Sequence, residues 1–532
     1  DGPFQWRVLA CSALSVVVFV CHTFIFELTA LVMNHWCLPP DDLGNLTLAQ
    51  WMNASIPIEE DGSFSQCVMY DNQSAPKNDS IRKIVSCSAW YFDLAEYGNT
   101  IISEWSLVCH RSWLVPLASM VCDSGTVVCL PLLGMAADRV GRRPVACACV
   151  VALIFTGFAS ALTKSFLAFV MVRFVLLASA SSLMAILLVA LHEVTAPAKR
   201  VLYYTINAAM AFVLTPVIFI LLSLFHLDWM VFHLVLMVPT SLLLATFYVV
   251  QESPRWLLAT WKLKAAEQVT LLSAKINGTS LDDARQSFNK AAARMRGSIT
   301  DNEAPLTIAL IGLLRQPKHQ KNAVLLSCAC FAVEFAYTAI ISRDRLVSYD
   351  WVPIIFLAST VPLYVSFFFC VSRHGRKKVT VALTGLISIE TTVLVSTYND
   401  GKATLFASIV LLLVKMSCSA AYTAVFVFTL DLFPTVFRCI GVSTAYACGT
   451  VGTLLATLLI EFETTRLRKD LLLLLIALLT IVGALCLENI PETAGAVLFS
   501  RLKRSSSQVD GKHALLASLS AQSSVRRKHK SR

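Results

Sequence analysis

Long apolar stretches recur along the whole chain and alternate with short polar segments. Twelve of them are long enough to cross a bilayer, because a spanning helix needs about 20 mostly apolar residues. The predicted spans cover residues 8–33, 112–136, 145–163, 166–191, 201–225, 230–250, 322–342, 351–371, 379–397, 403–430, 439–460 and 471–488. The pattern therefore predicts an all-α membrane protein.

The composition agrees with a membrane-embedded chain. Of its 532 residues, 56% are hydrophobic and 15% are charged, whereas soluble domains carry roughly 25% charged residues. A soluble surface needs more polar groups than this, and disordered chains are poor in apolar residues. Positive loops at the cytoplasmic face explain the net charge of +10, so no nucleic-acid partner is predicted.

The charges of the loops orient the predicted helices. Lys and Arg gather after every second span and in the tail, while the other loops are nearly neutral or acidic. The positive-inside rule then places both termini in the cytosol, and we expect a multi-pass plasma-membrane protein.

The same pattern divides the chain into six predicted segments. They are helix 1 (1–33), an extracellular loop (34–111), helices 2 to 6 (112–250), a cytoplasmic segment (251–321), a C-terminal six-helix half (322–488) and a basic cytoplasmic tail (489–532). The lipid bilayer is the expected partner of the spans. The basic tail is a candidate site for anionic lipid or for cytoplasmic regulators.

The predicted extracellular loop has the composition of a secreted domain. It combines four cysteines with four Asn-x-Ser/Thr sequons, which is typical of a disulfide-bonded glycoprotein segment. The cysteines are Cys37, Cys67, Cys87 and Cys109, and the sequons begin at Asn45, Asn53, Asn72 and Asn78. Four cysteines allow three connectivities, and all three remain open.

Three short motifs recur in the same order, about 235 to 240 residues further along the chain. Residues 138–143 read DRVGRR and are echoed by SRHGRK at 372–377. Glu193 and Arg200 are matched by the acid and the arginine that begin and end 431–438, and Glu252 is matched more weakly by Glu492. This order predicts two six-helix halves that arose by duplication.

The repeated motifs predict charge clusters at the cytoplasmic face. A carboxylate at a buried helix end needs a basic partner, and a glycine permits the tight turn between two spans. The residues concerned are Asp138, Arg139, Gly141, Arg142, Arg143, Glu193, Arg200, Glu252 and Arg255, with Arg373, Arg376, Asp431 and Arg438 in the second half. Such clusters act as latches that release in one state, or as static anchors.

The order of these motifs resembles a known transporter family. DRVGRRP at 138–144 is similar to the loop signature of the major facilitator superfamily, and ESPRWLL at 252–258 is similar to the segment after helix 6 of its sugar and organic-ion carriers. The cysteine-bearing loop, SEWSLVC at 103–109 and DLFPTVFR at 431–438 resemble the organic cation/anion/zwitterion branch, solute carrier family 22. The resemblance implies a major facilitator fold and alternating access around a central site.

Ionisable residues inside spans are costly, and they are therefore candidates for substrate binding. Lys415 and Glu334 lie near the middle of the tenth and seventh spans. Glu334 either pairs with Lys415 or contacts the substrate. His22 and Glu27 lie in the outer part of the first span.

The resemblance implies roles for four more residues. Tyr337 matches an aromatic position of the family pocket, and Arg173 matches an arginine for which we expect a structural or gating role. Relatives carry a charge at the positions of Thr450 and Thr360, and these are neutral here. The sequence therefore leaves the charge of the substrate open.

The predicted function is polyspecific transport of small organic ions (cations, anions or zwitterions) by alternating access. A receptor or scaffold without transport is one alternative, favoured by the neutral Thr450 and Thr360. A hexose-type facilitator is another, disfavoured by the cysteine-rich loop and by the scarcity of Asn and Gln in the spans. No nucleophile–base set, phosphate loop or metal-ligand spacing is found, so we expect neither enzyme activity nor a cofactor or metal.

Overall fold

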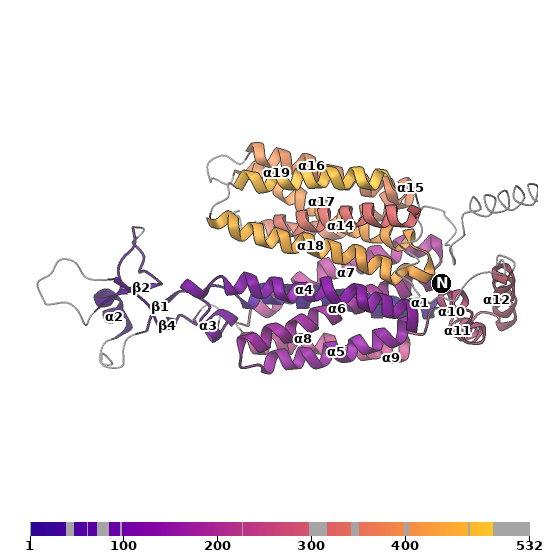
Figure 1. Cartoon of the computed structure of the whole chain (residues 1–532), viewed down its shortest axis with the longest axis horizontal. Coiled ribbons are helices and arrows are strands. Elements are labelled where there is room, and N and C mark those ends of the chain that lie inside the picture. The colour runs from indigo at the N-terminus through magenta and orange to yellow at the C-terminus, as the bar shows by residue number, and fades with distance from the viewer. Residues whose placement is uncertain are drawn as a thin grey trace, which may run out of the picture.

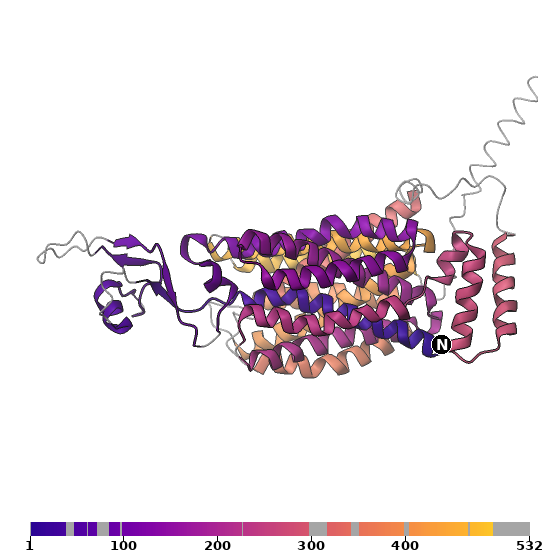
Figure 2. The same ribbon diagram turned by 90° about the horizontal axis from the view of Figure 1, so that it is seen from below.

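The computed structural model is a helical bundle, and the residues that it describes include twelve helices that are long and apolar enough to cross a membrane. It describes residues 2–38, 47–60, 62–71, 84–95, 98–225, 227–296, 317–341, 351–397, 404–465 and 469–492. The prediction of twelve spans in two six-helix halves is confirmed. Figures 1 and 2 show the helices of both halves running along one common axis.

The first half holds six spans, and the last of them is interrupted. The helices are α1 (Pro3–Thr29), α4 (Leu114–Val140), α5 (Arg142–Leu162), α6 (Phe166–Val194), α7 (Arg200–Ser223) and α8 (Trp229–Ser241), which continues through a 3₁₀ turn (Leu242–Ala245) into α9 (Thr246–Val249). The first span begins five residues earlier than predicted, because Pro3 suits the first helical position and Gly2 caps it.

The second half also holds six spans. They are α14 (Pro317–Ile341), α15 (Trp351–His374), α16 (Arg376–Thr397), α17 (Leu405–Leu432), α18 (Arg438–Thr465) and α19 (Lys469–Glu488). Several spans extend past their apolar stretches into charged residues, since a helix continues until a cap or a turn ends it. Hydropathy marks the part of a helix that is apolar enough to lie in lipid and not its charged ends.

Small strands and short helices lie at one end of the bundle, which we call the outer end (Figure 1). They are β1 (His35–Cys37), α2 (Leu48–Ser55), β2 (Val68–Tyr70), β3 (Ile84–Ser86), β4 (Trp90–Phe92) and α3 (Ile101–Trp105). Strand β1 pairs antiparallel with β4, and β2 pairs antiparallel with β3.

Two disulfides close this segment and select one of the three connectivities. Cys37 is bonded to Cys87, and Cys67 is bonded to Cys109. Asn53 is exposed on α2, where a glycan has room. The sequons at Asn45, Asn72 and Asn78, and the basic tail from residue 493, lie outside the described residues.

Three helices lie at the opposite end of the bundle, which we call the inner end (Figure 1). They are α10 (Pro254–Ala259), α11 (Leu263–Ile276) and α12 (Leu281–Arg296). The buried Trp256 ties α10 to the bundle, because its Nε1 donates to the backbone oxygen of Asp138 at 3.0 Å. By the loop-charge prediction, the inner end is cytoplasmic and the outer end extracellular.

Candidate transport cavity and inner-end charge cluster

A cavity lies between the two halves and encloses about 1310 Å³ of unoccupied space, including the part open to solvent. Its walls come from α1, α4, α6 and α7 of the first half and from α14, α17 and α18 of the second. The lining begins at Tyr204, near the inner end, and reaches Glu27 and Ile341, near the outer ends of α1 and α14.

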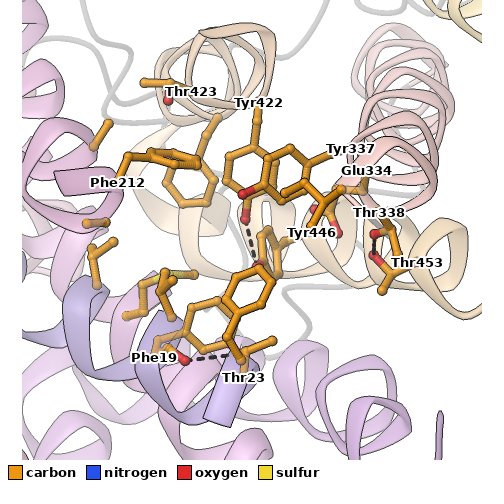
Figure 3. Close-up of a pocket in the computed structure, with 18 of the residues that line it drawn as sticks. Phe19, Thr23, Phe212, Glu334, Tyr337, Thr338, Tyr422, Thr423, Tyr446 and Thr453 are labelled. Carbon is orange, nitrogen blue, oxygen red and sulfur yellow. Dashed lines mark hydrogen bonds between the residues drawn. The ribbon is translucent and has the colours of Figure 1, made fainter. Parts of the chain in front are cut away.

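Aromatic rings from both halves form much of this wall. Tyr337 lies 5.7 Å from Tyr422 and 6.1 Å from Phe212, between ring centroids. The Tyr422 hydroxyl donates to the Tyr446 hydroxyl at 2.8 Å, and the Tyr446 ring lies 6.2 Å from Phe19. Aromatic faces can stack on a ring or attract a cation. Figure 3 shows these rings around the space that they enclose.

Three carboxylates line the same cavity, and they come from different helices. Glu27 lies on α1, Asp123 on α4 and Glu334 on α14. Of the described residues that line the cavity, none is Lys, Arg or His. The lining is therefore acidic and aromatic.

Glu334 is held in place by its neighbours. It is 7% exposed and hydrogen-bonded to Thr453, which also accepts a hydrogen bond from the Thr338 hydroxyl at 3.2 Å (Figure 3). Gly449 faces the carboxylate so closely that a Cβ there would collide with it. The absence of a side chain at Gly449 thus leaves space for the buried Glu334 carboxylate.

The residues for which the sequence predicted substrate contact fall into two groups, those that line the cavity and those that do not. Glu27, Glu334 and Tyr337 line the cavity, whereas Lys415 and His22 do not. The hydrogen bond of Glu334 runs to Thr453, and Lys415 is buried on α17. The Nε2 of His22 is hydrogen-bonded to the Thr240 hydroxyl at 3.0 Å, outside the cavity lining.

The two neutral threonines also lie outside the lining. Thr450 donates to the backbone oxygen of Tyr446 at 3.2 Å, and Thr360 donates to that of Phe356 at 2.8 Å. Both hydroxyls satisfy their own helices. A position within a predicted span does not reveal which way the side chain points. The sequence therefore could not show that these two threonines lie outside the cavity lining.

Asp123 is a lining residue that the sequence reasoning missed. It lies inside the predicted span 112–136, so the rule that selected Glu334 also selects it. No hydrogen bond or ion pair joins its carboxylate to another described residue. Glu390 is a second missed acid, but it lies outside the cavity lining and accepts a hydrogen bond from Ser417 at 3.1 Å.

Arg173 lies inside the first half and outside the cavity lining, where it contacts residues of α1 and α6. It is completely buried and donates to the backbone oxygen of His22 at 2.6 Å. Its guanidinium lies 5.7 Å from the ring centroid of Phe26 and 5.8 Å from that of Phe169. These contacts favour the structural role over direct substrate contact.

A charge cluster joins the two halves at the inner end. Glu193 accepts from Arg142 of its own half at 3.3 Å and from Arg438 of the other half at 2.8 Å. Asp431 pairs with Arg376 of its own half and, at 3.3 Å, with Arg200 of the other. The two carboxylates thus hold equivalent partners, as the predicted repeat implies.

Asp138 crosses between the halves in a different way. Its two carboxylate oxygens accept from the backbone N–H groups of Cys439 and Ile440 at 3.3 and 2.9 Å, at the start of α18. A carboxylate at a helix N-terminus is favourable because it satisfies free N–H groups and faces the positive end of the dipole. Arg142 pairs with Asp138 at 3.0 Å and donates to the Thr435 backbone oxygen at 2.7 Å.

The weakest of the repeated motifs also has a matching structural role. Glu252 accepts from the backbone N–H groups of Arg142 and Arg143 at 2.9 and 3.2 Å, which caps α5. Glu492 accepts from the backbone N–H of Lys377 at 3.2 Å, which caps α16. Gly141 has φ of 130°, and a Cβ there would meet the Glu252 carboxylate.

The remaining basic residues of the predicted cluster differ in burial. Arg139 and Arg373 are exposed, while Arg255 is half-buried. Burial, and after it the nearby charges of Arg200 and Arg438, lowers the pKa of Arg255 to about 10. The structure thus brings most of the predicted cluster together and leaves two of its arginines in solvent.

Residues 62–500 match the family model described as "Sugar (and other) transporter". The chain belongs to this family. A sugar (and other) transporter is a membrane carrier of the major facilitator superfamily, so the resemblance identified from the motifs is confirmed.

Two relatives from this family align with most of the chain. It is 25% identical to a beta-alanine transporter of Drosophila melanogaster over 92% of this chain and 85% of that protein. It is 27% identical to human solute carrier family 22 member 7 over 86% of each.

Solved structures support the fold. The bacterial proton:xylose symporter XylE has a TM-score of 0.65 at 14% identity, covering 93% of this chain and 98% of that one. A human organic anion transporter has a TM-score of 0.54 at 12% identity, covering 92% and 100%. At these identities the likeness concerns the fold alone.

Proposed function

We propose that this protein carries small organic ions across the plasma membrane by alternating access of its two halves. The observation that carries the proposal is a cavity between the halves, lined by three carboxylates and several aromatic rings. Binding sites at the interface of the two repeats are the general rule for such folds. Of the two relatives described above, one is named a beta-alanine transporter and the other a solute carrier.

The inner-end charge cluster supports a conformation that is closed at the inner end. Two buried ion pairs, Glu193–Arg438 and Asp431–Arg200, cross between the halves there. The lining continues instead toward the outer ends of α1 and α14. Opening the inner end requires that both pairs break, and in this sense we propose the cluster as a latch.

The charge of the lining favours substrates that carry a positive group. Three carboxylates with no basic residue among the described lining would repel a simple anion. An ammonium group gains from such an environment, and the aromatic rings can face its apolar part. A cation or a zwitterion is thus the favoured substrate, and beta-alanine, for which one relative is named, is a zwitterion.

Uptake into proteoliposomes tests the proposal with labelled organic cations, organic anions and beta-alanine. We expect saturable uptake of at least one cation or zwitterion, and at least a tenfold loss in Glu334→Gln, because a charge-assisted contact is removed. Glu390→Gln is the matched control: it neutralises another acid inside a span but outside the cavity lining, and should retain uptake. A folded, reconstituted protein that carries no probe would overturn the transport proposal, and uptake of anions alone would overturn the preference for a positively charged group.

A further inference from the structure

His192 lies two residues from the inner end of α6 and connects the cavity to the inner-end charge cluster. Its ring is completely buried, and its Nδ1 is hydrogen-bonded to the Tyr204 hydroxyl at 2.6 Å. Tyr204 lies on α7 and lines the cavity. The Nε2 of His192 lies 3.4 Å from the Oδ1 of Asp431, which belongs to the second half. The ring therefore lies at the interface that must separate when the inner end opens.

These two contacts assign the tautomer of the ring. A carboxylate such as Asp431 can only accept, so the Nε2 of His192 carries the hydrogen that faces it. Nδ1 is then an acceptor, and the Tyr204 hydroxyl donates to it. The Nε2 has no hydrogen-bond partner among the described residues, so its contact with Asp431 is electrostatic. In this conformation the ring is neutral.

A further proton on the ring is unfavourable while the inner end is closed. The charged groups that face the ring from neighbouring elements are Arg200 on α7, Arg255 on α10, Arg376 on α16, Arg438 on α18 and Asp431 on α17, and Glu193 follows His192 on α6. Asp431 already pairs with Arg200 and Arg376, and Glu193 already pairs with two arginines of the cluster. A buried imidazolium would therefore lack a carboxylate of its own, and such a charge is costly.

Opening of the inner end removes this obstacle. Arg376, Arg438 and Asp431 belong to the second half and move away from His192, whereas Tyr204 belongs to the first half and stays. The ring then loses two of the four arginines named above and meets water. A proton from the cytosol can bind Nδ1, and the Tyr204 hydroxyl can turn to accept a hydrogen bond from it. The Tyr204 contact is thus kept in both protonation states.

We propose that His192 is a proton-operated switch of the inner end, which takes up a cytosolic proton only when the halves separate. An acidic cytosol then stabilises the conformation that is open at the inner end (inner-open). This inference rests on the proposed function, because it concerns the regulation of the same latch.

The direction and the size of the effect follow from linkage. The inner-open form binds a proton that the closed form does not bind, so its population rises as the pH falls. A hydrated imidazole has a pKa of about 6.5, and one such proton raises the ratio of inner-open to inner-closed molecules roughly tenfold between pH 7.5 and pH 5.5. If attraction to Asp431 dominated instead, acid would stabilise the closed form and the sign would be the opposite.

Cysteine labelling in inside-out vesicles, whose outer medium sets the pH at the inner end, measures this ratio. Val427 lies on α17, lines the cavity and is 3% exposed, so Val427→Cys reacts with an impermeant maleimide only when the inner end opens. Gln268→Cys, at an exposed position of α11 in the same molecule, reacts in both conformations. The ratio of the two labels, read by site-resolved mass spectrometry, cancels the pH dependence of the reagent. We expect this ratio to rise roughly tenfold from pH 7.5 to pH 5.5.

The variant His192→Gln assigns the effect to this ring. Glutamine is neutral at both pH values and keeps an N–H donor toward Asp431, so the rise of the label ratio should be abolished. His192→Asn is a second neutral replacement with the same expected result. The matched control is His374→Gln, which removes an exposed histidine at the inner end of α15 and should keep the full rise.

Uptake measurements on the same preparations separate this inference from the proposed function. If the protein carries a probe but the label ratio stays constant or falls with acid, or if His192→Gln and His192→Asn keep the rise, the inference is wrong while the transport proposal stands. If Val427→Cys is labelled at neither pH, the inner end does not open and the inference fails. Absence of uptake of every probe would show that the transport proposal fails as well.

Discussion

Neutralising Glu193 should shift the protein toward the conformation that is open at the inner end. Its carboxylate is completely buried and joins Arg438 of the other half at 2.8 Å. Arg142 belongs to the same half as Glu193, so that contact at 3.3 Å can persist when the halves separate. The contact with Arg438 cannot persist, and Glu193→Gln therefore weakens the closed inner end selectively.

The size of the shift follows from the type of interaction. A hydrogen bond between charged groups contributes roughly 1.5–3 kcal/mol, and each 1.4 kcal/mol changes a population ratio by about a factor of ten. Glu193→Gln should therefore raise the ratio of inner-open to inner-closed molecules by roughly 10- to 100-fold.

Cysteine labelling from the inner side measures this ratio. Leu188 is 5% exposed, lies on α6 and lines the cavity, so Leu188→Cys reacts with an impermeant maleimide in inside-out vesicles only when the inner end opens. Site-resolved mass spectrometry separates this label from that of the native cysteines. The control is Glu267→Gln, which removes an exposed ion pair with Arg285 on the inner-end helices and is expected to be silent.

If the cysteine of Leu188→Cys is labelled no faster in the Glu193→Gln variant than in the Glu267→Gln variant, the Glu193–Arg438 pair is an anchor with no part in closure. Faster labelling in both variants would point to general loosening of the inner face and would also refute a latch at Glu193.

Three further predictions concern local structure. Gly141→Ala should lower the thermal unfolding temperature by several degrees in detergent, since it places a Cβ at a φ of 130° and against the Glu252 carboxylate; an unchanged temperature would contradict this backbone geometry. Peptide mapping without reduction should find Cys37 linked to Cys87 and Cys67 linked to Cys109, and any other pairing contradicts the loop structure. Asn53→Gln should remove one glycosidase-sensitive mass increment in expressing cells, because Asn53 is exposed at the predicted extracellular end.

The fold was largely predictable from the sequence, because hydropathy acts locally and strongly in a membrane protein. A spanning segment must satisfy its own backbone hydrogen bonds, so a long apolar stretch can only become a helix. The repeated motifs also predicted that the basic partners of Glu193 and Asp431 belong to one charge cluster, although they did not assign the individual pairs. Even the weak match between Glu252 and Glu492 corresponds to a shared capping role.

The cavity was less predictable, because its composition depends on helix rotation. Glu334 and Lys415 have the same status in the sequence, as charges near the middle of a span. Only the rotation of α14 and α17 about their axes places Glu334 on the cavity wall and leaves Lys415 outside it. Packing between helices sets that rotation, and no local pattern records it.

The order of residues along the chain already implied that it spans a membrane, how many times it does so, and which acids and bases gather at one face. These properties follow from the free energy of moving each side chain between water and lipid, which is a sum over local residues. Only the packed bundle shows that Glu27, Asp123 and Glu334 face one space together, and that the Oδ1 of Asn207 beside it has no hydrogen-bond partner among the described residues. Those properties depend on which helices approach one another and by which face, and that is settled by the packing of the whole bundle.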